Sequence, residues 1–268
     1  MVHDPLKPIA VQLGPIQVHW YAIIIVFAIL VGYGLASLEC RRQRIDQEVL
    51  DRFLFIVVPV AILCARMYYA VFHWKDYAGH PADIPAIWKG GLAIHGALIG
   101  SLIVTIIFTR AMRLSFWRWA DLLAPSLILG QAIGRWGNFM NQEAHGGPVT
   151  RAFLEHLHLP DLIINHMYIQ GQYYAPTFLY ESVWDFLGFV LLLLLKRLPL
   201  KNGERFLGYL IWYSSGRYVI EGMRTDSLML TSSIKMAQVV SVVAIAAGLL
   251  ILIYRRLRPE EKSEKLQK

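Results

Sequence analysis

Seven apolar blocks, each close to the length of a membrane-crossing helix, constrain this chain most strongly. They span residues 19–38, 53–72, 92–109, 119–134, 176–195, 206–222 and 236–254. A helix needs roughly 20 apolar residues to cross the hydrocarbon core, with a range of about 17–25. Five blocks meet that length, whereas the fourth is short and the sixth carries Arg217 and Glu221. The pattern predicts an all-α, polytopic membrane protein with about seven transmembrane helices.

Composition supports this prediction and excludes an ordinary soluble domain. The chain is 56% hydrophobic and 17% charged, whereas soluble domains are about 25% charged. The net charge of +7 is assigned to basic anchors at an anionic membrane surface. We therefore expect the lipid bilayer as a partner and no nucleic acid.

The distribution of Lys and Arg predicts the orientation. Basic residues gather in alternate connections and at the end of the chain: Arg41, Arg42, Arg44, Arg52; Arg110, Arg113, Arg118; Lys196, Arg197, Lys201, Arg205; Arg255, Arg256, Arg258, Lys262, Lys265 and Lys268. The positive-inside rule places these segments in the cytoplasm and the N-terminus outside. We expect one transmembrane catalytic domain over 1–254, an outer-face insertion at about 135–175 between spans four and five, and a charged cytoplasmic tail over 255–268.

Ionisable residues inside membrane helices are energetically unfavourable, so a functional role is the default hypothesis for them. The first such cluster surrounds His95, between Gly90 and Gly100. Gly96 and Gly100 share a helical face that lets two helices approach closely. The alternatives are a packed helix interface with a hydrogen-bonded histidine, or a histidine that transfers protons near neutral pH.

The second cluster follows the fourth block, from Gly134 to Gly147. It contains Arg135, Asn138, Asn141 and Glu143 beside aromatic residues. Arginine offers a planar set of donors that suits phosphate, and glutamate can orient it or act as a base. The alternative is a polar turn at headgroup level.

The third cluster repeats at helical spacing: Tyr213, Arg217, Glu221 and Arg224. These four residues would share one face of a helix. They form either a structural ion pair or a second phosphate-binding arginine held by Glu221.

Two further residues are expected on the same side of the membrane. Tyr21 opens the first block and Glu181 opens the fifth, where we expect Glu181 to meet an arginine. With the topology above, every one of these groups lies in the outer half of the bilayer, so they predict a phospholipid headgroup site. The two cysteines and scattered histidines give no metal-binding pattern, and neither metal nor cofactor is expected.

At these residues the chain resembles the bacterial phosphatidylglycerol–prolipoprotein diacylglyceryl transferases. Residues Gly134 to Gly146 match the family signature at each fixed position, and the residues from His95 to Gly100 match a second motif except at Ala97. The order of motifs matches over nearly the whole chain. Before span five the resemblance weakens, because Ala175 and Phe178 stand where the family often has histidine and glutamine.

The resemblance implies a reaction in the bacterial inner (cytoplasmic) membrane, at its outer leaflet. The diacylglyceryl group of phosphatidylglycerol moves to the lipobox cysteine thiol of a preprolipoprotein, forming a thioether. We assign the leaving phosphate to Arg135 and Arg217 and the base to His95, with Glu143 or Glu221 as the competing base. The substrate-binding candidates are Tyr21, Asn138, Asn141, Gly146, Glu181, Tyr213 and Arg224.

The competing hypothesis is a transporter or binding protein for an anionic lipid. Transport would require polar residues to continue through the cytoplasmic half of the membrane. Asp121 and Asp185 are the main candidates there. This one-sided distribution favours an enzyme.

Overall fold

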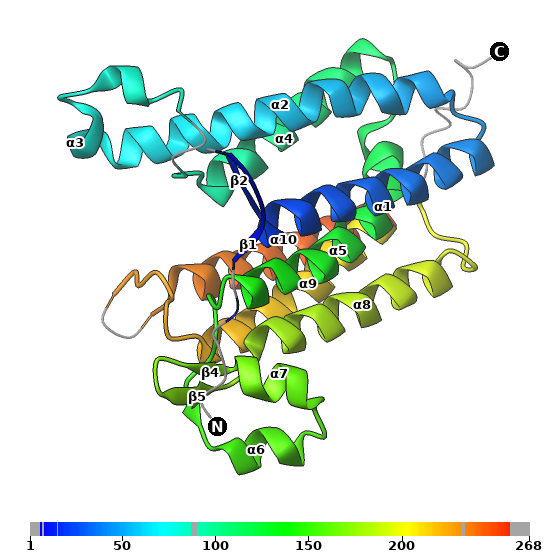
Figure 1. Cartoon of the computed structure of the whole chain (residues 1–268). Helices are drawn as coiled ribbons and strands as arrows, with labels where there is room; N and C mark the ends of the chain where they lie inside the picture. Colours follow the sequence, from blue (N-terminus) through cyan, green and yellow to red (C-terminus); the bar gives the residue numbers. More distant parts are fainter. Residues whose placement is uncertain (1–5, 7, 15, 87–89, 232–233, 258–268) are drawn as a thin grey trace. The chain divides into compact units, whose positions relative to one another are not determined.

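The computed structural model describes residues 6, 8–14, 16–86, 90–231 and 234–257, and within them the chain is mostly helical (Figure 1). Each apolar block forms one long helix: α1 (Trp20–Arg42), α2 (Gln47–Phe72), α4 (Ile94–Ala111), α5 (Phe116–Met140), α8 (Thr177–Leu195), α9 (Glu204–Met223) and α10 (Met236–Leu257). All except α5 and α9 are long and apolar enough to cross a membrane. The tail predicted over 255–268 lies outside the described residues from 258 onward.

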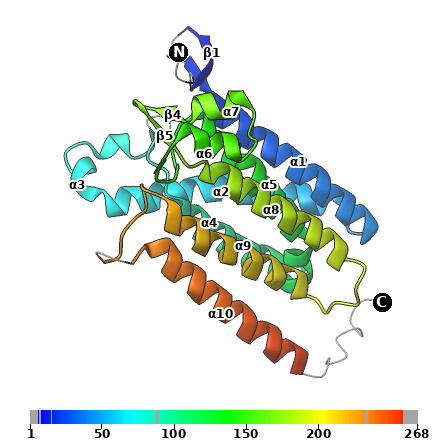
Figure 2. The same cartoon turned by 90° about the horizontal axis from the view of Figure 1, so that it is seen from below.

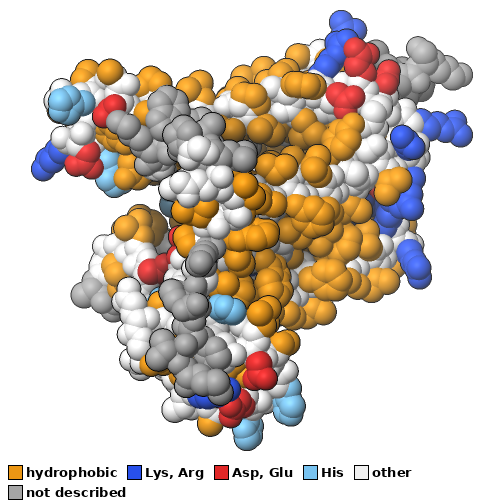
Figure 3. Space-filling view, viewed as in Figure 1, with side chains coloured by type: hydrophobic (Ala, Val, Ile, Leu, Met, Phe, Trp, Pro, Cys, Tyr) orange, Lys and Arg blue, Asp and Glu red, His pale blue; other side chains and the backbone are white. Residues whose placement is uncertain are grey.

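The sides of these long helices are exposed and apolar. Figure 3 shows hydrophobic side chains over most of the helical surface in view. Phe55 is 82% exposed, Leu250 68% and Ile107 61%. Water does not favour so large an apolar surface, whereas lipid chains do. The fold is therefore that of a multi-pass membrane protein, as the apolar blocks predicted.

The chain divides into two compact units, one formed by Met1–Leu35 and Leu123–Lys268 and the other by Ala36–Leu122. In the second unit α2 and α4 lie side by side (Figure 1). The glycine face of α4 makes this possible, because a Cβ on Gly100 would lie 2.7 Å from the side chain of Cys64. The predicted close helix interface at Gly96 and Gly100 is confirmed.

Buried Arg66 organises the segment that leads into α4. Its guanidinium donates hydrogen bonds to the carbonyl oxygens of Asp83 (2.9 Å), Ile84 (2.6 Å), Gly90 (2.6 Å) and Gly91 (3.0 Å). The segment contains α3 (Trp74–Tyr77) and the short 3-10 helix η1 (Pro81–Asp83). Arg66 satisfies backbone carbonyl groups that have no helical partner. This structural role accounts for the presence of a buried arginine in α2.

In the first unit α9 lies between α8 and α10 (Figure 2). Trp184 of α8 and Trp212 of α9 stack with their ring centroids 4.4 Å apart. Each indole N–H also donates to the backbone carbonyl of the other tryptophan, at 2.9 and 3.0 Å. Gly188 and Gly216 leave the space that the two indoles occupy. This reciprocal contact holds together the helices that carry Glu181, Arg217 and Glu221 of the predicted site.

Residues 147–175 form a small folded element at the ends of α5 and α8 (Figure 1). Its members are β3 (Pro148–Val149), α6 (Arg151–His156), α7 (Asp161–His166), β4 (Tyr168–Ile169) and β5 (Gln172–Tyr174), with strand order β3-β5-β4. Leu154 and Ile164 are buried against Phe139 and Phe178 of the long helices. At the N-terminus, β1 (Ile9–Leu13) and β2 (Ile16–His19) pair as an antiparallel hairpin before α1.

Candidate functional site

The Gly134–Gly146 motif begins within a helix. We expected the fourth block to end at 134, but α5 continues to Met140, so that boundary was wrong. The polar side chains after Gly134 lower the local hydropathy, so hydropathy alone does not show that the helix continues. Their spacing is still helical. Gly137 lies against the ring of Tyr21, and a Cβ there would come within 2.7 Å of it. The contact at Gly137 therefore packs α1 against α5 near Arg135.

Glu181 connects the two predicted arginines. Its side chain is 7% exposed, and the side chains of Arg135 and Arg217 are each 18% exposed. One carboxylate oxygen pairs with Nε of Arg135. The other accepts a hydrogen bond from Nη1 of Arg217 at 2.5 Å. The expected contact between Glu181 and an arginine is confirmed, and both arginines take part.

The ion pairs continue along α9 and past its end. Glu221, 3% exposed in its side chain, contacts Nη2 of Arg217 at 2.6 Å and Nη1 of Arg224 at 3.7 Å. The Arg217 contact is an ion contact without hydrogen-bond alignment, so Glu221 Oε2 has no aligned donor within the part of the chain that the structure describes. The predicted pairing of Arg217 with Glu221 is confirmed. Arg224 also makes two 3.0 Å hydrogen bonds to Asp226.

Arg224 and Asp226 lie beyond the last helical residue of α9. Burial acts to raise the pKa of Asp226, but the hydrogen bonds and charge of Arg224 outweigh it and lower this pKa. Asp226 therefore stays ionised and keeps the guanidinium of Arg224 oriented.

Glu143 is linked to Arg135 through the side-chain amide of Asn138. Its carboxylate accepts hydrogen bonds from Nδ2 of Asn138 at 2.9 Å and of Asn141 at 3.4 Å. Asn138 in turn accepts from Nη1 of Arg135 at 3.4 Å. Glu143 thus orients Arg135 indirectly, and it stays exposed, as a base must to reach a substrate. The buried Oδ1 of Asn141 has no partner among the described residues.

Gly146 joins the motif to the end of α9. Its backbone forms a bridge with Arg224 and its N–H donates to Ala175 at 2.9 Å. A Cβ on Gly146 would lie 2.9 Å from Cβ of Ala175 and 3.1 Å from Cγ2 of Thr177. Only glycine fits this crossing of three chain segments.

Tyr213 of α9 and Asp185 of α8 lie near the two arginines. Tyr213 interacts electrostatically with Arg135 and Arg217, and so does Asp185. Asp185 is 2% exposed and its Oδ2 has no hydrogen-bond partner among the described residues. The sequence prediction counted Asp185 with the cytoplasmic half. Its spacing of four from Glu181 was the signal that places both acids on one helix face.

His95 belongs to the other compact unit, at the second residue of α4. Its exposed ring stacks on that of Tyr68, with centroids 5.9 Å apart. The contact places the imidazole against an aromatic ring of the neighbouring α2.

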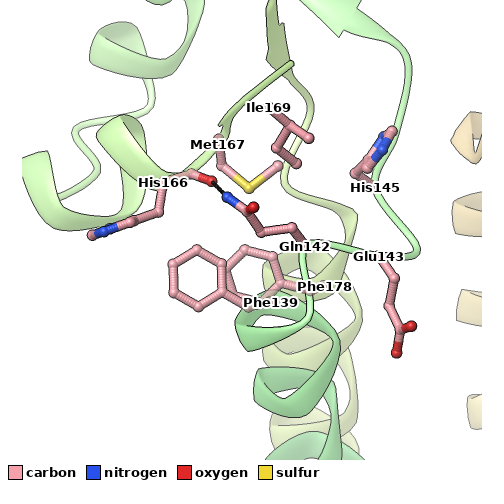
Figure 4. Close-up of a pocket in the computed structure, with 8 residues that line it drawn as sticks. All are labelled: Phe139, Gln142, Glu143, His145, His166, Met167, Ile169 and Phe178. Carbon is pink, nitrogen blue, oxygen red and sulfur yellow. Dashed lines mark hydrogen bonds between the residues drawn. The ribbon is translucent and has the colours of Figure 1, made fainter. Parts of the chain in front are cut away.

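A small pocket lies beside the motif, between α5 and the 147–175 element. Figure 4 shows it lined by Phe139, Gln142, Glu143, His145, His166, Met167, Ile169 and Phe178. Phe139 and Phe178 stack at 4.5 Å, and Gln142 donates to the backbone carbonyl of His166 at 3.1 Å. The carboxylate of Glu143 points away from the two phenyl rings (Figure 4).

Taken together, exposed apolar helices and buried arginine–glutamate pairs define a multi-pass membrane protein with a charged internal site. The prolipoprotein diacylglyceryl transferase family model matches residues 8–254. The chain belongs to this family.

Similar proteins carry the same activity in their names. A phosphatidylglycerol–prolipoprotein diacylglyceryl transferase of Bacillus licheniformis is 58% identical over 258 residues, 96% of each chain. The Bacillus velezensis protein of that name is 56% identical over 254 residues, 95% of this chain and 94% of its own. The one from Geobacillus kaustophilus is 57% identical, again over 95% and 94%. These likenesses favour the transferase over the transporter or binding protein.

Proposed function

We propose that this chain transfers the diacylglyceryl group of phosphatidylglycerol to the lipobox cysteine thiol of preprolipoproteins. The observation that carries the proposal is the bridge from Arg135 through Glu181 to Arg217, buried among helices whose outer surfaces are apolar. Paired arginines in such surroundings suit a phosphate at the edge of the membrane. The membership of the family and the names of its relatives support the same conclusion.

The reaction breaks one carbon–oxygen bond and forms one carbon–sulfur bond. The thiolate attacks the terminal glyceryl carbon of the lipid, and glycerol phosphate leaves with the bonding electron pair. Negative charge therefore grows on the phosphate in the transition state, where preoriented cationic donors stabilise it most. Arg135 and Arg217 supply those donors, and Glu181 holds both guanidinium groups in place.

The thiol must lose its proton before it attacks, because the thiolate is the nucleophile. We assign this proton to His95, whose exposed imidazole can accept a proton on a ring nitrogen. Glu143 and Glu221 are the competing acceptors. Glu143 is exposed, whereas Glu221 is already engaged with Arg217 and Arg224.

The remaining site residues bind the lipid headgroup in this proposal. Asn138 and Tyr21 lie near Arg135, Asn141 donates to Glu143, and Tyr213 lies near both arginines. Arg224 and Gly146 close the same site from the end of α9. Neither metal nor cofactor is required by this chemistry.

We further propose seven spans, α1, α2, α4, α5, α8, α9 and α10, in the bacterial cytoplasmic membrane. The bias of Lys and Arg toward alternate connections supports an outside N-terminus and a cytoplasmic C-terminus. With this orientation the ends of α5 and α9 that carry the arginines face the outer leaflet, together with residues 141–175. Residues 1–254 act as one catalytic domain, and 255–268 are its cytoplasmic tail.

The proposal is tested with purified protein, phosphatidylglycerol vesicles and a peptide carrying a lipobox cysteine. We expect the peptide to gain the mass of one diacylglyceryl group. Arg135→Ala and Arg217→Ala should each reduce the rate by at least about a hundredfold, as loss of a transition-state donor does. An Arg151→Ala variant is the control, since Arg151 pairs at the surface with Glu155.

Two results would contradict the proposal. The first is no mass gain with wild-type protein while an authentic transferase is active in the same vesicles. The second is wild-type turnover in either arginine variant, which would remove that arginine from the mechanism.

A further inference from the structure

Lys235 joins the start of α10 to the end of α9. Its ammonium donates hydrogen bonds to the backbone carbonyls of Glu221 at 2.7 Å, Gly222 at 3.1 Å and Arg224 at 2.6 Å. A lysine has three N–H donors, and here all three serve a single helix end. The final carbonyls of a helix lack intrahelical partners and carry partial negative charge, so a cation stabilises them.

This helix end carries charges of the proposed site. The side chain of Glu221 contacts Arg217 at 2.6 Å and Arg224 at 3.7 Å. The backbone of Arg224 also bridges to Gly146, the last residue of the family motif. Lys235 and Gly146 therefore hold the backbone of Arg224 from two different parts of the chain.

We propose that Lys235 is a positioning residue for the transfer reaction, acting through Arg224. It fixes the backbone from which the side chains of Glu221 and Arg224 project, so that these two groups meet Arg217 in one geometry. The inference rests on the proposed function, but it concerns a residue outside the predicted site.

A neighbouring contact provides a control for simple helix docking. Gln238, one turn further along α10, donates from Nε2 to the carbonyl of Tyr218 at 3.2 Å. This bond also ties α10 to α9, but Tyr218 points to the exposed side and belongs to no ion pair among the described residues. If Lys235 only docks α10, Gln238→Ala should reproduce its effect.

The test measures kcat and KM of lipobox-peptide modification, together with thermal unfolding in detergent. We expect Lys235→Met to lower kcat/KM by about tenfold, because one charged donor that serves three carbonyls is lost. Lys235→Arg, which keeps the cation, should recover most of that activity. Gln238→Ala should lower the unfolding temperature while kcat/KM stays within about twofold of wild type. If Lys235→Met does not fold, Lys235→Gln replaces it in every comparison.

A double-mutant cycle with Arg224→Gln tests the route of the effect. Groups that act through one another give non-additive losses. We expect Lys235→Met to reduce kcat/KM by less than about twofold when Arg224→Gln is already present.

Equal losses in both backgrounds would overturn the proposal, and so would wild-type kinetics in Lys235→Met or a matching kinetic loss in Gln238→Ala. These outcomes all require active wild-type protein. Inactivity of the wild type would instead count against the transferase function itself.

Discussion

Glu181 shows how a single carboxylate makes two buried arginines tolerable. Its two oxygens serve different guanidinium groups, one from α5 and one from α9. Removing one partner of a buried ion pair is costly, because the remaining charge stays desolvated. The arrangement also fixes the direction in which each guanidinium can offer its other N–H groups to a phosphate.

Glu181→Gln should therefore impair both stability and catalysis. We expect the free energy of unfolding to fall by about 3 kcal/mol and the transfer rate to fall by about a hundredfold. Chemical denaturation and the peptide mass assay measure the two effects. Glu155→Gln is the matched control, because that glutamate is 52% exposed and pairs with Arg151 at the surface. Unchanged stability in Glu181→Gln would show that the bridge is energetically unimportant.

At the scale of elements, the contact between α8 and α9 determines whether Glu181 can reach Arg217. The two helices meet at the Trp184–Trp212 stack, and Gly216 accommodates the indole of Trp184. A methyl group at this position has no room unless the helices separate. Small residues at an interface let membrane helices approach closely, so that van der Waals packing can hold them together.

Gly216→Ala should weaken this helix pair. The added Cβ would overlap the Trp184 ring, and overpacking of this kind costs about 1–3 kcal/mol. Gly130→Ala is the control on α5, where an added Cβ has no described atom within 4 Å beyond its chain neighbours and its own helix backbone. Thermal unfolding and the transfer rate should fall only in Gly216→Ala. Equal behaviour of the two variants would mean that the Trp184 contact does not hold α8 against α9.

For the whole molecule, the decisive property is the side of the membrane on which each connection lies. Gln172 is exposed in β5, before α8, and Asn202 is exposed between α8 and α9. With the proposed orientation, α8 separates an outer Gln172 from a cytoplasmic Asn202. The basic residues around 196–205 and the positive-inside rule are the reason for this assignment.

Single cysteines test this orientation in a background where Cys40 and Cys64 are alanine. In intact cells, a membrane-impermeant maleimide should label Gln172→Cys without permeabilisation. Asn202→Cys should react only after the membrane is opened. Labelling in the opposite order would reverse the topology, and labelling of both in intact cells would mean that α8 does not cross the membrane.

The sequence by itself was enough to predict the long helices and several of the charged residues that meet, but not Asp185 or Asp226. Hydropathy depends on local composition, and all seven blocks became helices. The spacing of four between Arg217 and Glu221 was likewise sufficient to predict their contact, because helix geometry is local. The hydropathy prediction failed at the end of α5. Polar residues there lower the local hydropathy, although six further residues are helical.

The contacts between distant segments were decided only by the tertiary structure. No local pattern indicates that Glu181 meets both Arg135 and Arg217, that Gly146 bridges to Arg224, or that Lys235 caps the end of α9. Such contacts depend on which helices pack together, and that choice comes from shape at residues such as Gly216 and Trp184. Charge and hydropathy determined which segments became long apolar helices with ionisable residues, and packing determined which of those residues meet.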